Sequence, residues 1–338
     1  MQAELIPVHV CSNRNRYPDL GRTEHHYPSQ SHVEEALLPR GGSHTKSICM
    51  VRGDELTVVK LSRDVADPVS VRAMTMLIEQ FNQRELLTLA AGGHTLEETR
   101  RMVTAGYWHQ MTSHSAAMIR PTDGAVVCAA VCIPFTPLRV HVVKRIVTAL
   151  RGGCMDDLAD LPQGLVQYVC ADRHPEVLWF LAECDEAVSN LAQLGDGPQR
   201  SMASKLAAYS VQSGGGCTLV EEIALIASAP DSPRGAMTSL VSHILKDMWT
   251  DGVRMAIGHY SNLSVGLAVR TGGVELASVK YCDSEALKRY PGEPPDSDRI
   301  EKHIKTPVPT GRQGPPAEFF VAHDLDYLSA RYDWHSHR

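Results

Sequence analysis

The stretch that decides the fold is SPRGAMTSLVSHILKDMWTDGVRMAIGHYSN, residues 232–262. A proline, an arginine and a glycine open it, apolar residues at helical spacing follow, and a turn at Asp251 and Gly252 leads to a second apolar run. A glycine at this point lets backbone N–H groups approach a ligand closely, and the helix N-terminus behind it favours an anion. The pattern therefore predicts an anion-binding turn between a strand and a helix.

Strands are predicted on both sides of this helix. The run CTLVEEIALIAS, residues 217–228, precedes it, and VRMAIGHY, residues 253–260, follows it. A short helix over 263–273, a strand and a Pro-rich loop lead to a last strand at 317–325. A strand–helix–strand order of this kind predicts that the first two strands are adjacent and parallel.

The sequence pattern of the N-terminal half predicts two hairpins separated by helices. Short β-rich runs within residues 47–62 predict the first hairpin, and a helix is predicted over 70–86. A second helix begins after Thr95, which forms a capping-box pattern with Glu98. The second hairpin is predicted over 115–135.

Four segments follow from these patterns. They are a polar N-terminal arm at 1–47, the first half of an α/β domain at 48–136, a mostly helical insertion at 137–216, and the second half of the domain at 217–330.

Composition narrows the class of protein. The chain has 338 residues, 43% hydrophobic and 21% charged, which is typical of a soluble globular protein. A net charge of −6 argues against a dedicated nucleic-acid binder. Nine cysteines without a C-x-x-C pair, no signal-peptide pattern and no long apolar run favour a reducing, cytoplasmic location without a membrane span. The sixteen histidines show no metal-site spacing, so we expect no metal.

The order of elements resembles that of the GNAT superfamily of acyltransferases. The resemblance covers about 55–136 and 217–328, and its specific part lies within 217–274. It implies an α/β fold with a mixed central sheet flanked by helices, and with the helical insertion between core strands three and four. In that family the fourth strand splays from the fifth, and the pantetheine of acyl-CoA pairs with the backbone of the fourth strand in the gap.

The resemblance also implies a donor site. In that family the loop after the fourth strand reads Q/R-x-x-G-x-G/A and binds the CoA pyrophosphate. Here Gly235 matches this pattern, whereas Ser232 and Met237 depart from it. The implied contacts to acyl-CoA or acetyl-CoA are Ile226, Ala227, Ser228, Arg234, Gly235, Ala236, Met237 and Asn262. A tight turn at Gly235 and a helix N-cap at Asn262 are the structural alternatives.

Glu221 is the candidate general base. It interrupts an apolar strand, where a carboxylate is costly to bury without a partner or a purpose. The resemblance places a base fourteen residues before the loop glycine, which is Glu221 here. Strand alternation sends Glu222 to the opposite face. The tyrosine that serves as acid in the family is replaced by Val269, so Tyr260 and His259 are the alternatives for that role.

An aromatic and histidine-rich run precedes the second hairpin. It comprises Tyr107, Trp108, His109 and His114. These side chains would either line an acceptor pocket or form the end of a helix that packs on the core.

Three functions remain open on this basis. The leading one is transfer of an acyl group from acyl-CoA to a small-molecule amine, with Glu221 as base. The second uses an aminoacyl-tRNA or acyl carrier protein as donor; the basic residues Arg139, His141, Lys144, Arg145 and Arg151 would favour it, although such a run is also typical of a solvated helix face. The third is a non-catalytic GNAT-like protein that binds a ligand or partner. The oligomeric state is open, and a homodimer is compatible with the sequence.

Overall fold

The computed structural model describes residues 47–51, 53–64, 66–90, 95–161, 166, 175–194, 196–212, 218–288 and 314–334. All of them belong to one compact unit of the chain, residues 41–338. The predicted N-terminal arm up to residue 46, Cys217 and most of the Pro-rich loop lie outside the described residues. Among the described helices, none has the length and apolar character needed to cross a membrane.

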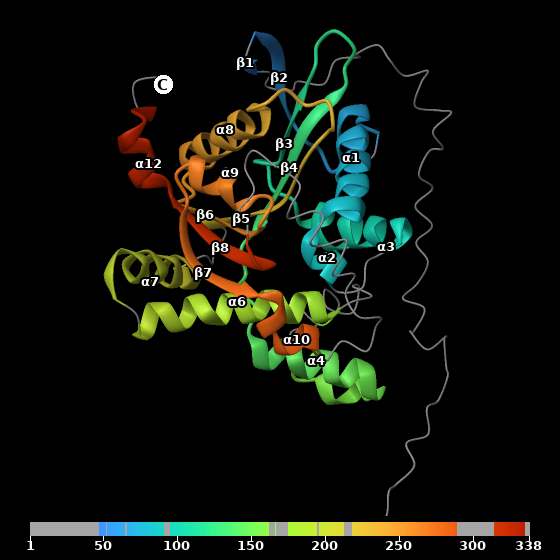
Figure 1. The fold of residues 1–338 in the computed structure, drawn as a ribbon, viewed down its shortest axis with the longest axis vertical. Coiled ribbons are helices and arrows are strands. Elements are labelled where there is room, and N and C mark those ends of the chain that lie inside the picture. The colour runs from blue at the N-terminus through green and yellow to red at the C-terminus, as the bar shows by residue number, and fades with distance from the viewer. Residues whose placement is uncertain are drawn as a thin grey trace, which may run out of the picture. The chain divides into compact units, whose positions relative to one another are not determined.

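Eight strands form one mixed sheet (Figure 1). They are β1 (Ser47–Val51), β2 (Asp54–Lys60), β3 (Ala116–Ile119), β4 (Val126–Pro134), β5 (Val220–Ser228), β6 (Met255–Ser261), β7 (Val274–Lys280) and β8 (Ala317–Asp324), in the spatial order β1-β2-β3-β4-β5-β6-β8-β7. All neighbours are antiparallel except β5 and β6, which are parallel. The predicted fold class, the two hairpins and the adjacent parallel pair are confirmed.

Helices cover both faces of the sheet (Figure 1). The first face carries α8 (Ala236–Thr250), with α9 (Val265–Arg270) and α12 (Leu325–Arg331) packed against α8. The second face carries α1 (Pro68–Arg84) over β4 and β5, and α6 (Pro175–Leu194) and α7 (Gly197–Gln212) towards β7 and β8. Shorter helices are α2 (Leu86–Ala90), α3 (Leu96–Arg101), α4 (Val140–Gly152) and α10 (Glu285–Lys288).

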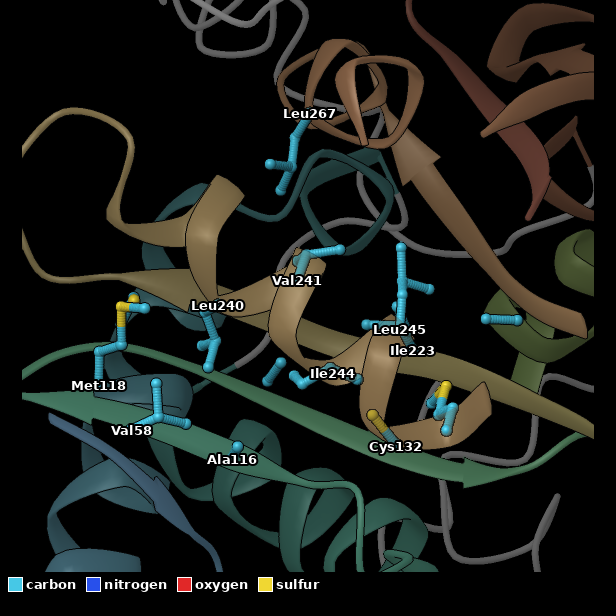
Figure 2. Packing of buried hydrophobic residues seen from close by; sticks show 14 of the residues in the cluster. Val58, Ala116, Met118, Cys132, Ile223, Leu240, Val241, Ile244, Leu245 and Leu267 are labelled. Carbon is cyan, nitrogen blue, oxygen red and sulfur yellow. The ribbon is translucent and has the colours of Figure 1, made fainter. Parts of the chain in front are cut away.

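The apolar spacing of the sequence builds the core on the α8 face (Figure 2). Leu240 and Ile244 of α8 lie over Met118 and Cys132, which point to this face from β3 and β4. Their strand neighbours, among them Val131, point to the opposite face and pack under α1. Full burial of a Leu or Ile side chain contributes about 1.5–3 kcal/mol to the free energy of folding. A shift of one residue in strand register would turn these side chains to the opposite face, so the register is strongly favoured.

Helix boundaries follow the capping residues. Asp67 caps α1 by accepting hydrogen bonds from the backbone N–H groups of Val69 and Ser70. The predicted capping box of Thr95 and Glu98 is present at α3. The helix that the sequence predicts here ends at Arg101 and continues as a π-helical turn. Between β4 and β5, the described residues form helices and a 3-10 turn, with α4, α6 and α7 as the main elements.

The parallel pair separates early, and this opening positions the candidate site. The ladder between β5 and β6 joins only Val220–Glu222 to Met255–Ile257. On its other side, β5 pairs with β4 as far as Ser228, with an irregularity at Ala224. Beyond Glu222, the β6-facing edge of β5 therefore has no ladder partner among the strands that the structure describes.

Candidate active site

A cavity of about 840 Å³ opens where β5 and β6 separate. Its walls come from β5, the N-terminus of α8, α9, the C-terminal end of α1, the start of α6 and the start of β8. Glu222, Ile223, Ala224, Ile226, Ala227 and Ser228 line it from β5. The predicted donor residues of this strand thus border the cavity.

The loop before α8 forms one end of the cavity. Arg234, Gly235 and Met237, three of the residues predicted to contact the donor, line it. Ala236 does not: its side chain is fully buried in the core against α8's own apolar neighbours. The first turn of the helix points this side chain into the protein, and a donor contact of Ala236 stays a prediction.

The N-terminus of α8 has no side-chain cap. Gly235 is the N-cap residue, and its φ of 102° lies in the left-handed region that favours glycine. The N–H of Ala236 donates to the carbonyl oxygen of Pro233 at 3.0 Å. Met237 and Thr238, in the first turn, line the cavity. An uncapped helix N-terminus beside Arg234 is a favourable environment for an anion.

Asn262 has a different place from the one predicted. Its side chain is buried, accepts a hydrogen bond from the N–H of Ala317 at 2.8 Å and donates to the carbonyl oxygen of Pro315 at 3.2 Å. It does not line the cavity, and Ser264 is the N-cap of α9. Asn262 therefore joins the end of β6 to the segment that enters β8. The alternative of a helix N-cap at Asn262 is wrong, and its donor contact stays a prediction.

Glu221 also departs from the prediction, because it does not line the cavity. Its carboxylate accepts a hydrogen bond from the Thr112 hydroxyl at 2.7 Å and lies 3.0 Å from Nδ1 of His114. Nε2 of His114 lies 3.1 Å from the Asp251 carboxylate. The Glu221 and His114 side chains are only 4% and 5% exposed. Glu221 is thus part of a buried polar network on the α8 face.

Glu222 points into the cavity instead. Its carboxylate lies 3.2 Å from Nδ1 of His259, and Nε2 of the same ring lies 3.2 Å from the Asp185 carboxylate of α6. The N–H of Leu138 donates to the second oxygen of Asp185 at 2.7 Å. The imidazole is therefore held between two carboxylates and in turn orients Glu222.

Hydrogen bonds keep His259 charged. Burial lowers the pKa of His259, but its hydrogen bonds to Asp185 and Glu222 outweigh that effect and raise the pKa to about 10. Burial also raises the pKa of Asp185, and the hydrogen bond to His259 opposes the rise. His259 therefore carries its proton at neutral pH and is unsuited to act as a base. It lines the cavity, and its role as an acid stays a prediction.

The raised pKa of His259 predicts a pH-dependent stability. An unfolded imidazole loses its charge near pH 6.5, whereas the folded one keeps it to about pH 10. The stabilisation is therefore complete below pH 6.5 and is lost as the pH rises through about 10. We expect the free energy of unfolding in urea to fall less between pH 6 and pH 10 in His259→Gln than in the wild type. Equal falls in both proteins would contradict a charged His259.

Tyr260 has an unusual environment. Its ring is 2% exposed, and its hydroxyl has no hydrogen-bond partner among the described residues. Burial and the neighbouring Cys132 and Glu222 raise the pKa of the Tyr260 phenol well above its ordinary value. The phenol keeps its proton at neutral pH, but Tyr260 is not among the residues that line the cavity. Its role as a catalytic acid stays a prediction.

Further acidic groups line the cavity on the second face. Glu85, the C-cap residue of α1, and Glu318 of β8 lie there with Glu222. The Tyr281 hydroxyl donates to Glu318 at 2.9 Å. The sequence analysis missed Glu318, although it interrupts an apolar strand as Glu221 does. It also missed Asp185, which lies on the buried side of a helix.

The aromatic run before β3 divides between the two alternatives. Tyr107 lines the cavity. Trp108 is buried in the core under α1, and His109 is exposed. His114 belongs to the Glu221 network. The run is therefore mainly a packed helix end, with a single side chain reaching the cavity.

Comparison with known proteins gives matches among solved structures. An agmatine N-acetyltransferase aligns with a TM-score of 0.43 and 12% identity over 79% of this chain and 99% of that one. A mosquito arylalkylamine N-acetyltransferase aligns with a TM-score of 0.44 and 10% identity over 80% of this chain and 99% of that one. A Drosophila melanogaster polyamine N-acetyltransferase aligns with a TM-score of 0.42 and 11% identity over 80% of this chain and 99% of that one. No family model and no curated protein matches the sequence. The chain is similar to these acetyltransferases.

Proposed function

We propose that the protein is an acyl-CoA-dependent N-acyltransferase that acts on a small amine. The observation that carries this proposal is the early end of the ladder between β5 and β6, which leaves a cavity beside the N-terminus of α8. The same opening combines a free strand edge, an anion-binding helix end and a group of carboxylates.

The free edge of β5 suits the amides of pantetheine. Beyond Glu222, backbone N–H and C=O groups of β5 border the cavity without a ladder partner on β6. An extended ligand with its own amides can hydrogen-bond to such an edge as an additional strand would. Ile226, Ala227 and Ser228 would then contact the pantetheine arm.

The phosphates of CoA would bind at the end of the cavity formed by α8. The uncapped N-terminus at Gly235 offers backbone N–H groups and the positive end of the helix dipole. Arg234 and Arg270 line the same cavity and are exposed, so both can neutralise phosphate charge. Met237 lines this end where the family pattern has a small residue, so it would contact the bound phosphates or ribose.

The acceptor would approach from the second face. Glu85, Glu222 and Glu318 line the cavity there and favour a cationic amine. The carboxylates of Glu85 and Glu222 would repel a substrate that carries a carboxylate next to its amine. We therefore propose an acceptor amine without an α-carboxylate.

Glu222 would act as the general base. As the amine nitrogen attacks the thioester carbonyl, the N–H bond breaks towards the Glu222 carboxylate and the C–S bond then breaks. The thiolate of CoA takes up the proton, so the proton that leaves the nitrogen ends on sulfur. His259, fixed by Asp185, holds Glu222 in position.

The structure offers less support for the alternative donors. Three of the five residues of the basic run are paired with carboxylates: Lys144 with Glu285, Arg145 with Asp160, and Arg151 with Glu176. Paired cations attract phosphate less strongly, which weakens the case for an aminoacyl-tRNA or an acyl carrier protein. A non-catalytic binding protein would not need a polar chain such as Asp185–His259–Glu222 in its cavity.

Acetyl-CoA binding tests the donor. At a hundredfold excess over Kd a ligand stabilises the protein by about 2.7 kcal/mol, so a shift in Tm should be seen. We expect Arg234→Ala to weaken the shift, and Arg254→Ala, a change to a half-buried arginine outside the cavity, to leave it unchanged. Amine transfer is then measured with matched pairs, phenethylamine against phenylalanine and 1,5-diaminopentane against lysine. Absence of a shift with any acyl-CoA would exclude this donor.

A further inference from the structure

The cavity holds a carboxyl group that the proposed reaction has not yet used. Resting on the proposed function, we propose that Glu318 accepts the first proton from the acceptor ammonium ion, and that Glu85 and Tyr281 tune it for this step. Glu222 then takes the second proton during attack. The two carboxylates have separate tasks because an ammonium nitrogen must lose two protons to become an amide.

Glu318 is fixed at the start of β8. It pairs with Ser261 of β6 and with Val279 of β7, so it lies in the interior of the sheet. Only 4% of Glu318 is exposed to solvent. The Tyr281 hydroxyl donates to its Oε2 at 2.9 Å. Glu318 is nevertheless one of the residues that line the cavity. A carboxyl group buried in the interior of a sheet is costly unless it has a partner or a function.

Glu85 supplies a second carboxyl group from a different element. Its Oε1 accepts a hydrogen bond from the N–H of Leu87 at 3.0 Å, which holds the side chain at the junction of α1 and α2. It lines the cavity together with Glu318. Two carboxyl groups in one partly enclosed site disfavour double ionisation.

The charged surroundings of Glu318 explain its affinity for a proton. Burial and the negative charge of Glu85 raise the pKa of Glu318 to about 8, whereas His259 and the Tyr281 hydrogen bond act in the opposite direction. The Cys184 thiol of α6 also faces this group, and its own pKa is raised by burial and by the charge of Glu318. A carboxyl group with this pKa is matched to proton exchange near neutral pH.

The balance of protons fits this assignment. An alkylammonium ion has a pKa near that of lysine, about 10.4, and an ordinary glutamate about 4.3, so that transfer between them is unfavourable by about 10⁶-fold. With Glu318 at about 8, the difference falls to a few hundredfold. In the transfer, an N–H bond of the ammonium ion breaks, an O–H bond forms on Glu318, and the electron pair stays on nitrogen as the lone pair that attacks. Glu318 then returns its proton to solvent.

The pH dependence of kcat/KM tests the inference, because two variants should shift the pH profile in opposite directions. We expect kcat/KM for phenethylamine to rise with pH through about 8 in the wild type. Glu85→Gln removes a like charge, so the rise should move to lower pH by about one unit. Tyr281→Phe removes a hydrogen bond to the ionised form, so the rise should move to higher pH. Glu79→Gln, an exposed change on α1, should leave it in place.

The free amine titrates at the same pH in every assay. A difference between variants in the pH at which kcat/KM rises therefore comes from a group on the enzyme. If neither Glu85→Gln nor Tyr281→Phe moves the rise while transfer continues, the role of Glu318 is overturned.

A second measurement does not require turnover. The infrared C=O band of a protonated carboxyl group should titrate near pH 8 in the wild type and be missing in Glu318→Gln, with circular dichroism as the check on folding. If that band is the same in both proteins, the inference is overturned. A normal band without acyl transfer from acetyl-CoA to any amine would instead overturn the proposed function. The two failures can therefore be told apart.

Discussion

Replacing Glu222 with glutamine is expected to lower kcat by about 10²–10⁴-fold at neutral pH, because general-base catalysis contributes that factor. Glutamine keeps the size of the side chain and can still hydrogen-bond to His259, but it cannot accept the proton of the attacking amine. Acetyl-CoA binding should stay near the wild-type level, because the donor contacts lie on β5 beyond Glu222 and at α8. Steady-state kinetics with isothermal titration of acetyl-CoA measures both quantities.

Glu221→Gln is the matched control. It makes the same chemical change at the adjacent position, whose side chain faces Thr112 and His114 outside the cavity. Its kcat should remain within a few-fold of the wild type. A large loss of kcat in Glu221→Gln, with Glu222→Gln unaffected, would reverse the assignment and restore the base that the sequence suggested.

The contrast between these two glutamates shows what strand alternation can predict. The sequence correctly indicates that they lie on opposite faces of β5. Which face meets the cavity depends on where β6 leaves the sheet, and on which helices cover each side. Those are tertiary facts that a spacing of fourteen residues to Gly235 does not contain.

The fold itself was accessible from local patterns. Apolar periodicity, the capping box at Thr95 and the glycine before α8 predicted the helices, the hairpins and the parallel pair. Each of these signals is a property of a few neighbouring residues. The end of the ladder after Glu222 is not, because it results from the packing of two whole strands.

The site was accessible only in part. The donor side follows the chain continuously from β5 into α8, so a motif could find it. The acidic groups on the second face of the sheet are Glu85, Asp185 and Glu318, which belong to three segments far apart in sequence. A charge in an apolar strand could have indicated Glu318, and a charge on the buried side of a helix could have indicated Asp185. Glu85, at the polar end of a helix, carries no such signal.

The second large effect concerns stability. Replacing Glu221 with alanine is expected to lower the free energy of unfolding by about 3–5 kcal/mol, the cost of breaking a buried pair by removing one partner. His114 and Thr112 would each lose a hydrogen-bond acceptor in an environment that excludes water. Equilibrium unfolding in urea measures this loss, and kcat for the folded fraction should change little.

A double variant separates the cost of an unpaired group from the value of the pair. In Glu221→Leu/His114→Leu neither member of the pair remains without its partner, and Asp251, whose side chain is 59% exposed, can be solvated. Replacing both members of a buried pair by apolar groups is often close to neutral. The double variant should therefore be more stable than Glu221→Ala. If it is instead destabilised by the sum of the two single changes, then Glu221 and His114 contribute independently and the network does not act as a unit.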